Sequence, residues 1–282
     1  MQQRKNAILL FSKVPQPGKV KTRLTVLKDG FLAPEWASNL YHCMLFDVVE
    51  CCCACAERLE ARCAEGGVQD VYDIIISCPG EAQEQAMREL FEASGSWPRP
   101  IRFIQDNGAT FDEHYNDAFS QAWALGYDTV LSMGCDMPAL TQDILETAFR
   151  YLHRLCQRDG GGIVLSPDQE MGVSIVGWTR DTAFDHSGVY YCQNGLTVLP
   201  AYVDKARRQG LPVHYLPAMP DVDTWADLRH NITLMQAIEY AAAFQDDLTV
   251  PHRTLAALAE LGLVDVRVMP NDLMDPRDEI DL

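Results

Sequence analysis

The chain has 282 residues, of which 48% are hydrophobic and 22% charged, so it is long enough for one large α/β domain with an appendage or for two small domains. Its 23 lysines and arginines face 40 aspartates and glutamates, and the resulting net charge of −17 argues against a general nucleic-acid binder. No apolar run approaches the roughly 20 residues of a membrane span. The first 13 residues lack a signal-peptide pattern, so we expect a cytoplasmic protein.

The first predicted strand, residues 7–11, leads into a basic loop at residues 12–24. Two prolines and Gly18 in this loop disfavour helix and strand, so the chain should turn on leaving the sheet. A basic, glycine-containing loop after the first strand is where an open α/β sheet binds phosphate. The Walker spacing is absent, and a solvated lysine-rich turn is the alternative. Five side chains here could bind an anion: Lys13, Lys19, Lys21, Thr22 and Arg23.

Helices and strands then alternate along the chain. The apolar spacing predicts helices at residues 34–63, 81–93, 111–126, 141–157 and 196–209, with a further one opening at Asp223. Buried strands are predicted at residues 71–77, 101–105, 128–133, 163–165, 173–178 and 213–216. This alternation predicts an α/β fold with a mostly parallel, Rossmann-like sheet flanked by helices on both faces.

The last part of the chain is expected to be an appendage. A short helix is predicted at residues 255–261, and residues 269–282 are acidic and interrupted by proline, as in a tail. We therefore divide the chain into one domain at residues 1–234 and a helical C-terminal extension with an acidic tail at residues 235–282.

Six of the ten cysteines lie between residues 43 and 63, within one predicted helix. Consecutive cysteines on a helix point in different directions and cannot all face one metal ion. Cys52 and Cys55 form a CxxC pair, but no second pair accompanies it. Small buried thiols are the simpler interpretation, and a thiol-based metal or redox site is the alternative. The exposed face of this helix is a candidate interface between copies of the chain.

Carboxylates follow two of the predicted strands. Asp136 lies in Gly-Cys-Asp-Met-Pro after the fourth strand, and Asp221 and Asp223 follow the seventh. Strand ends on one edge of a sheet share a crevice, so these side chains should face the basic loop. Mg²⁺ and Mn²⁺ bind carboxylates together with substrate phosphates, which predicts a nucleotidyl or glycosyl transfer site. The simpler alternatives are a turn aspartate for Asp136 and a helix N-cap for Asp223.

Three motifs taken together resemble one family. They are FSKVPQPGKVKTRL at residues 11–24, Gly-Cys-Asp-Met-Pro after a central strand, and Asp-Val-Asp-Thr-Trp-Ala-Asp-Leu from Asp221. Over residues 6–235 the chain resembles bacterial glycosyltransferase-like proteins (DUF2064) with the nucleotide-diphospho-sugar transferase (GT-A) fold. That family is related to 2-phospholactate guanylyltransferase and molybdenum cofactor guanylyltransferase.

The resemblance implies a set of functional residues. Nucleotide phosphates would contact Lys13, Gly18, Lys21, Thr22 and Arg23. Residues 105–119 resemble the family's nucleotide-proximal loop and helix, where Gly108 and Asp117 fall on matching positions. One or two Mg²⁺ or Mn²⁺ ions would be held by Asp136, Asp221 and Asp223. Asp136, Lys21 and Arg23 are the predicted catalytic residues.

The chain also departs from the family pattern. The family's Asp-Gly-Gly-Tyr is replaced by Glu170-Met171-Gly172-Val173, and residues 185–194 lack the usual Trp-Ser-Thr. These changes favour an altered acceptor or a lost activity. The hypotheses left open are a metal-dependent glycosyltransferase, a guanylyltransferase-like nucleotidyltransferase with a small phosphorylated acceptor, and a nucleotide-binding module without catalysis.

Two histidines and three aromatic residues are further candidates for contact with a ligand. His114 and His186 are candidate general bases, although phosphoryl-type transfer requires none and a lone histidine is more often structural. Trp178, Tyr190 and Tyr191 could stack on a base or sugar, but core packing is the commoner use of such residues.

Overall fold

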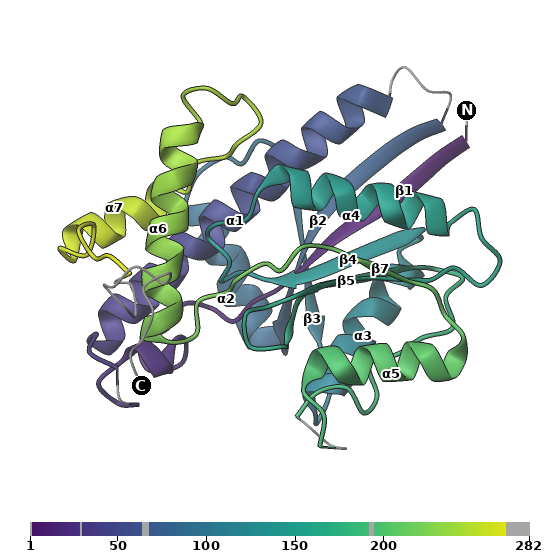
Figure 1. Cartoon of the computed structure of the whole chain (residues 1–282), viewed down its shortest axis with the longest axis horizontal. Coiled ribbons are helices and arrows are strands. Elements are labelled where there is room, and N and C mark those ends of the chain that lie inside the picture. The colour runs from purple at the N-terminus through teal and green to yellow at the C-terminus, as the bar shows by residue number, and fades with distance from the viewer. Residues whose placement is uncertain (1, 29, 64–67, 192–194, 269–282) are drawn as a thin grey trace, which may run out of the picture.

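The fold is built on one seven-stranded sheet with helices on both faces (Figure 1). The computed structural model describes residues 2–28, 30–63, 68–191 and 195–268. In sheet order the strands are β3 (Ile101–Asp106), β2 (Val68–Pro79), β1 (Gln2–Phe11), β4 (Thr129–Gly134), β6 (Val173–Thr179), β5 (Ile163–Pro167) and β7 (Val213–Tyr215). Only β6 runs antiparallel to its neighbours among these strands, which confirms the predicted α/β fold with a mostly parallel sheet.

Both faces of the sheet are buried because its central strands are apolar at successive positions. Along β1, Ile8 and Leu10 face one core while Ala7 and Leu9 face the other, and none of the four is exposed. The core on the first face includes residues of α1 (Pro34–Cys63), α2 (Glu81–Ala93), α4 (Gln142–Leu155), α6 (Trp225–Ala241) and α7 (His252–Glu260), of which α7 packs against α1. The second face is covered by α3 (Phe111–Ala124) and α5 (Val198–Gln209).

The cysteine-rich helix α1 belongs to the core. Cys51, Cys52, Cys53 and Cys55 are at most 2% exposed, and burial raises the pKa of Cys51 and Cys53 to about 12. Within the described part of the chain no cysteine belongs to a cluster spaced for a metal ion. Residues Pro34–Arg62 are long and apolar enough to cross a membrane, but 72% of their most apolar window is buried, as expected of a core helix.

The start of α6 differs from the sequence prediction. Its N-cap is Thr224, whose side chain accepts from the backbone N–H of Asp227, while the Asp227 carboxylate accepts from the backbone N–H of Thr224. This reciprocal capping box shows that the alternative role of Asp223 as N-cap is wrong. The expected domain boundary at residue 235 falls inside α6, and the division itself stays a prediction.

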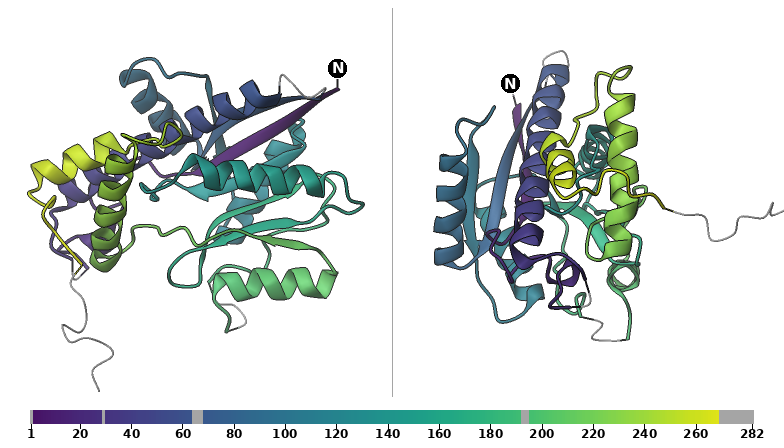
Figure 2. Two further views of the ribbon diagram at one scale, coloured as in Figure 1. Left: turned by 45° about the horizontal axis from the view of Figure 1, so that its top comes forward. Right: turned by 90° about the vertical axis from the view of Figure 1, so that its left-hand side faces the viewer.

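A buried carboxylate of α1, Asp47, is one of the contacts that fix the C-terminal extension. Helix α7 has no side-chain cap of its own at Pro251. Asp47 of α1 supplies one, because its Oδ2 accepts from the backbone N–H and the hydroxyl of Thr254, both at 2.7 Å. Asp47 is only 3% exposed, and α7 lies beside α1 in both views of Figure 2. The negative charge also meets the positive end of the α7 dipole.

Replacing Asp47 with alanine should loosen the extension. The loss of a cap and of a buried acceptor predicts a decrease of about 1–3 kcal/mol in the free energy of unfolding. Urea unfolding and amide hydrogen exchange over residues 252–260 would measure it. The control is Glu50→Ala, which removes a 40%-exposed partner of Arg253 and should cost less than about 1 kcal/mol. Equal losses in the two variants would contradict the anchoring role.

Candidate functional site

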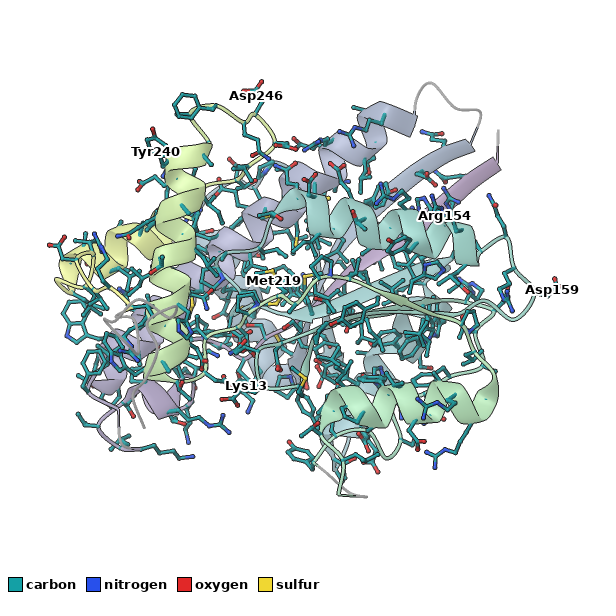
Figure 3. All side chains as sticks on the ribbon, viewed as in Figure 1. Lys13, Arg154, Asp159, Met219, Tyr240 and Asp246 are labelled. Atoms are coloured by element: carbon teal, nitrogen blue, oxygen red, sulfur yellow. The ribbon has the colours of Figure 1, made fainter. Side chains whose placement is uncertain are left out.

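The strand order changes direction between β1 and β4, and a crevice opens at their carboxyl ends. The chain leaves β1 toward β2 and β3 on one side and returns to β4 on the other. The basic loop and the segment after β4 both meet at this edge. A cavity of about 940 Å³ runs along it, and its lining includes Lys13, Lys21, Asp136, Asp221 and Asp223. Figure 3 places Lys13 at this edge and Asp159 at the opposite end of the molecule.

The basic loop has a defined path over the cavity. The backbone N–H of Ser12 donates to the Ser77 carbonyl at 3.0 Å, and that of Val14 donates to Oε1 of Gln83 at 2.9 Å. Gly18 has φ +72°, a left-handed conformation that glycine adopts without strain. Lys13 and Lys19 are exposed and line the cavity.

The three predicted metal ligands converge in space. After β4 the chain folds back so that a Cβ on Gly134 would lie 2.7 Å from Oδ1 of Asp136, which explains why glycine ends this strand. The backbone N–H of Val222 donates to the Asp136 carbonyl at 3.0 Å and holds Asp221 and Asp223 alongside. One carboxylate oxygen from each aspartate lies within 4.8 Å of the others.

Lys21 extends from the basic loop into this carboxylate cluster. Its Nζ lies 2.5 Å from Oδ2 of Asp136 and 3.0 Å from Oδ1 of Asp223, and its side chain is 6% exposed. Burial alone would lower the pKa of Lys21, but the charges and hydrogen bonds of the two carboxylates raise it above its usual value. Arg23 pairs with Asp223 at 3.1 Å from the more exposed side and does not line the cavity.

Asp221 is positioned by a residue that the sequence did not single out. Gln169 donates from Nε2 to Oδ1 of Asp221 at 2.8 Å, and its Oε1 accepts from the Asp221 backbone N–H at 3.2 Å. Burial, followed by the negative charges of Asp136 and Asp223, raises the pKa of Asp221 to about 7. Gln169 precedes the segment that departs from the family pattern, and a lone glutamine in a turn carries no signal that could have revealed this role.

A second group of lining residues is aromatic, and we call it the aromatic end of the cavity. Phe11 and Tyr115 stack with ring centroids 3.7 Å apart, and the ring of Phe111 lies 4.7 Å from that of Tyr190. All four line the cavity with Tyr191, which is 73% exposed. The sequence indicated Tyr190 and Tyr191 only as weak candidates and did not indicate Phe11, Phe111 or Tyr115.

A hydrogen-bonded chain of polar groups borders this aromatic end. Ser77 Oγ donates to Oδ2 of Asp106 at 2.6 Å, and Oδ1 of Asp106 lies 2.6 Å from Nδ1 of His114. Asp106 is 2% exposed, and all three residues line the cavity. The ring of His114 is thus oriented from the carboxyl ends of β2 and β3, and this contact depends on the path of the turn between β3 and α3.

Several predicted residues lie outside the cavity lining. Asp117 accepts from the backbone N–H of Asn107 at 2.9 Å, and Gly108 leaves no room for a Cβ against α3, so both shape the turn after β3. Thr22 begins a short 3₁₀ helix, η1 (Thr22–Leu24). Nucleotide contact by these three residues stays a prediction. His186 is completely buried, and Trp178 stacks on a core phenylalanine, so both serve packing.

The fold is that of nucleotide-diphospho-sugar transferases. A structure described as a "putative nucleotide-diphospho-sugar transferase" from Desulfovibrio desulfuricans G20 matches with a TM-score of 0.66 and 25% identity, covering 94% of this chain and 99% of that one. The model of the family "Uncharacterized protein conserved in bacteria (DUF2064)" matches residues 64–192, which confirms the predicted family resemblance for that part of the chain.

More distant similarities were also found. A cytidylyltransferase from Leptospira borgpetersenii matches at a TM-score of 0.49 and 12% identity, over 95% of this chain and 100% of that one. A 4-diphosphocytidyl-2C-methyl-D-erythritol synthase from Anaerococcus prevotii matches at a TM-score of 0.42 and 12% identity, over 83% of this chain and 99% of that one. A comparison with curated proteins gives no match.

The departure from the family pattern leaves a strained turn between β5 and β6. Met171, which replaces the first glycine of Asp-Gly-Gly-Tyr, has φ +65°. A left-handed conformation costs a residue with a side chain about 1–2 kcal/mol. Gly172 is retained where a Cβ would lie 2.0 Å from Oδ2 of Asp168, and Asp168 accepts from the backbone N–H groups of residues 170 and 172.

Substitutions at these two adjacent positions should have opposite effects. Met171→Gly should leave stability unchanged or raise it by up to about 1 kcal/mol, because strain is relieved while the unfolded chain gains freedom. Gly172→Ala should lower it by about 1–3 kcal/mol, because Asp168 must move out of its hydrogen bonds. Urea unfolding measures both. Met171→Ala keeps the Cβ and should not increase the free energy of unfolding. An increase equal to that of Met171→Gly would exclude backbone strain as the cause.

Proposed function

We propose that this protein is a metal-dependent transferase that binds a nucleotide or nucleotide-sugar in the crevice between β1 and β4. The observation that carries the proposal is the meeting of a cationic loop and three carboxylates at the point where the strand order reverses. Such a crevice is the usual ligand site of an open α/β sheet. The similarity to a structure named as a nucleotide-diphospho-sugar transferase, over 94% of the chain, supports the same conclusion.

The carboxylate cluster suits a hard divalent cation. Mg²⁺ and Mn²⁺ prefer oxygen ligands, and opposite ligands of Mg²⁺ lie about 4.2 Å apart, twice its usual bond length. The oxygens of Asp136, Asp221 and Asp223 are no more than 4.8 Å apart, so small side-chain rotations suffice. A bound ion would neutralise charge on the donor phosphates.

The remaining side chains of the cavity would contact different parts of the nucleotide. Lys13 and Lys21 would neutralise phosphate oxygens, with Arg23 supporting Asp223 from outside. The aromatic end, with Phe111 and Tyr191, would hold the planar base or the sugar ring. A cavity of about 940 Å³ is near the upper end of ligand-site volumes, which leaves space for an acceptor beside the donor.

Glycosyl and nucleotidyl transfer both fit these side chains, because either reaction needs mainly positioned phosphates and neutralised charge. The second candidate function is a nucleotide-binding module that does not catalyse, and the replacement of the family's Asp-Gly-Gly-Tyr by residues 170–173 favours it. Slow Mn²⁺-dependent hydrolysis of any nucleotide-sugar would exclude this second candidate.

Asp136→Asn should abolish metal-supported nucleotide binding while preserving the fold. Thermal shifts with nucleoside di- and triphosphates and nucleotide-sugars, with and without Mn²⁺, would measure the effect. A ligand at 100 times its dissociation constant should stabilise the wild-type protein by about 2.7 kcal/mol, and the variant should lose the Mn²⁺-dependent part. Asp159→Ala, an exposed carboxylate at the far end of the molecule, is the control (Figure 3). An unchanged shift in Asp136→Asn would remove the metal assignment.

Phe111→Ala should weaken nucleotide binding about tenfold, since stacking on one aromatic ring contributes about 1–3 kcal/mol. Calorimetry with the best nucleotide of the panel would measure the loss. Inorganic pyrophosphate, which has no ring to stack, should bind the variant and the wild-type protein equally. If the variant binds both ligands more weakly by the same factor, Phe111 acts on the phosphate site. The assignment of the base or sugar to the aromatic end is then wrong.

A further inference from the structure

The ammonium group of Lys21 lies inside the carboxylate cluster, where a divalent ion would have to bind. Its Nζ contacts one oxygen each of Asp136 and Asp223, at 2.5 and 3.0 Å. These two aspartates are two of the three ligands whose oxygens lie within 4.8 Å of one another. The basic loop therefore already supplies a cation to the acidic site.

This position is held from several sides. The Lys21 side chain is 6% exposed, and its Nζ lies 5.9 Å from the centre of the Tyr41 ring, within cation–π range. Tyr41 is itself fixed by a 2.8 Å hydrogen bond with Ser12 of the same loop. The backbone of Lys21 has φ +44°, which is uncommon for a residue with a Cβ and directs the side chain inward from η1.

A divalent ion and this ammonium cannot share the cluster. Both would bind the carboxylates of Asp136 and Asp223, and an ion among these carboxylates would lie a few ångströms from another positive charge in a partly buried site. Lys21 can leave only if its charge finds another partner, because an unpaired buried ammonium is costly. A phosphate group in the crevice would be such a partner, and exposed Lys13 and Lys19 line the path it would take.

We propose that Lys21 is an internal counter-cation that determines which form of metal the site accepts. It excludes free divalent ions and admits the chelate of a divalent metal with a polyphosphate, because the phosphate receives the ammonium as the ion takes the carboxylates. Binding of metal and of polyphosphate are then coupled through one side chain, and the coupling is reciprocal. This inference rests on the metal site of the proposed function.

The test is a titration with Mn²⁺ alone, in which free Mn²⁺ is followed by electron paramagnetic resonance. Lys21→Met removes the ammonium and keeps the length of the side chain, so it should bind Mn²⁺ at least tenfold more tightly than the wild-type protein, a difference of about 1.4 kcal/mol. Lys19→Met removes the same charge from the same cavity without freeing a carboxylate, and it should change the affinity less than threefold. Lys21→Arg keeps the positive charge and should bind Mn²⁺ as weakly as the wild-type protein does.

A second variant guards against misfolding. Lys21→Asn suits the left-handed backbone and cannot reach the carboxylates, so it should show the same gain as Lys21→Met. Equal or weaker Mn²⁺ binding by both variants, with wild type binding well, would overturn the role of Lys21 and leave the metal site intact. If no form binds Mn²⁺, the inference fails together with the metal site. In that case the thermal shift with nucleotide and Mn²⁺, compared between the wild-type protein and Asp136→Asn, decides whether the proposed function survives.

Discussion

The site depends on the pairing of one buried ammonium with two carboxylates. A lysine that is 6% exposed is stable in the interior only when opposite charges surround it, and clustered carboxylates equally require a cation. The contacts of Lys21 with Asp136 and Asp223 join residues 115 and 202 positions apart. Three segments of the chain are therefore held at one edge of the sheet by a single charge, and each stabilises the conformation of the others.

The backbone around this ion-pair cluster carries the strain that precise placement requires. Among the described residues, Lys21, Met171 and Tyr191 are the non-glycine positions with positive φ, and they lie in the basic loop, the β5–β6 turn and the segment that borders the aromatic end. Strained conformations persist where surrounding contacts over-determine them. Here those contacts include the ion pairs of Lys21 with Asp136 and Asp223 and the hydrogen bond that the backbone N–H of Leu199 donates to the Met171 carbonyl at 3.1 Å.

The sequence predicted what local patterns encode. Apolar runs defined the strands, and the acids after β4 and near Asp221 were placed at one edge because parallel strands end together. It could not predict that Gln169 orients Asp221 or that Asp47 caps α7, because each contact joins segments distant in sequence. It also could not predict that Asp106 orients His114, because the path of the turn between β3 and α3 decides how these two side chains meet. The Asp223 cap was wrong for a different reason. Thr224 with Asp227 forms a full capping box, which a single preceding aspartate does not match.

The segments around the cavity differ in how closely they follow the family pattern. The basic loop and Gly-Cys-Asp-Met-Pro keep their motifs, whereas the β5–β6 turn has exchanged a glycine for Met171 and residues 185–194 have lost the Trp-Ser-Thr. Binding of phosphate and metal requires the same charges whatever the acceptor is, so Lys21, Asp136 and Asp223 can rarely be replaced. An acceptor is recognised by shape and hydrogen bonds, which a different turn can supply. On the proposed function, the departures therefore concern the molecule that receives the transferred group, and the donor end keeps the chemistry of the fold.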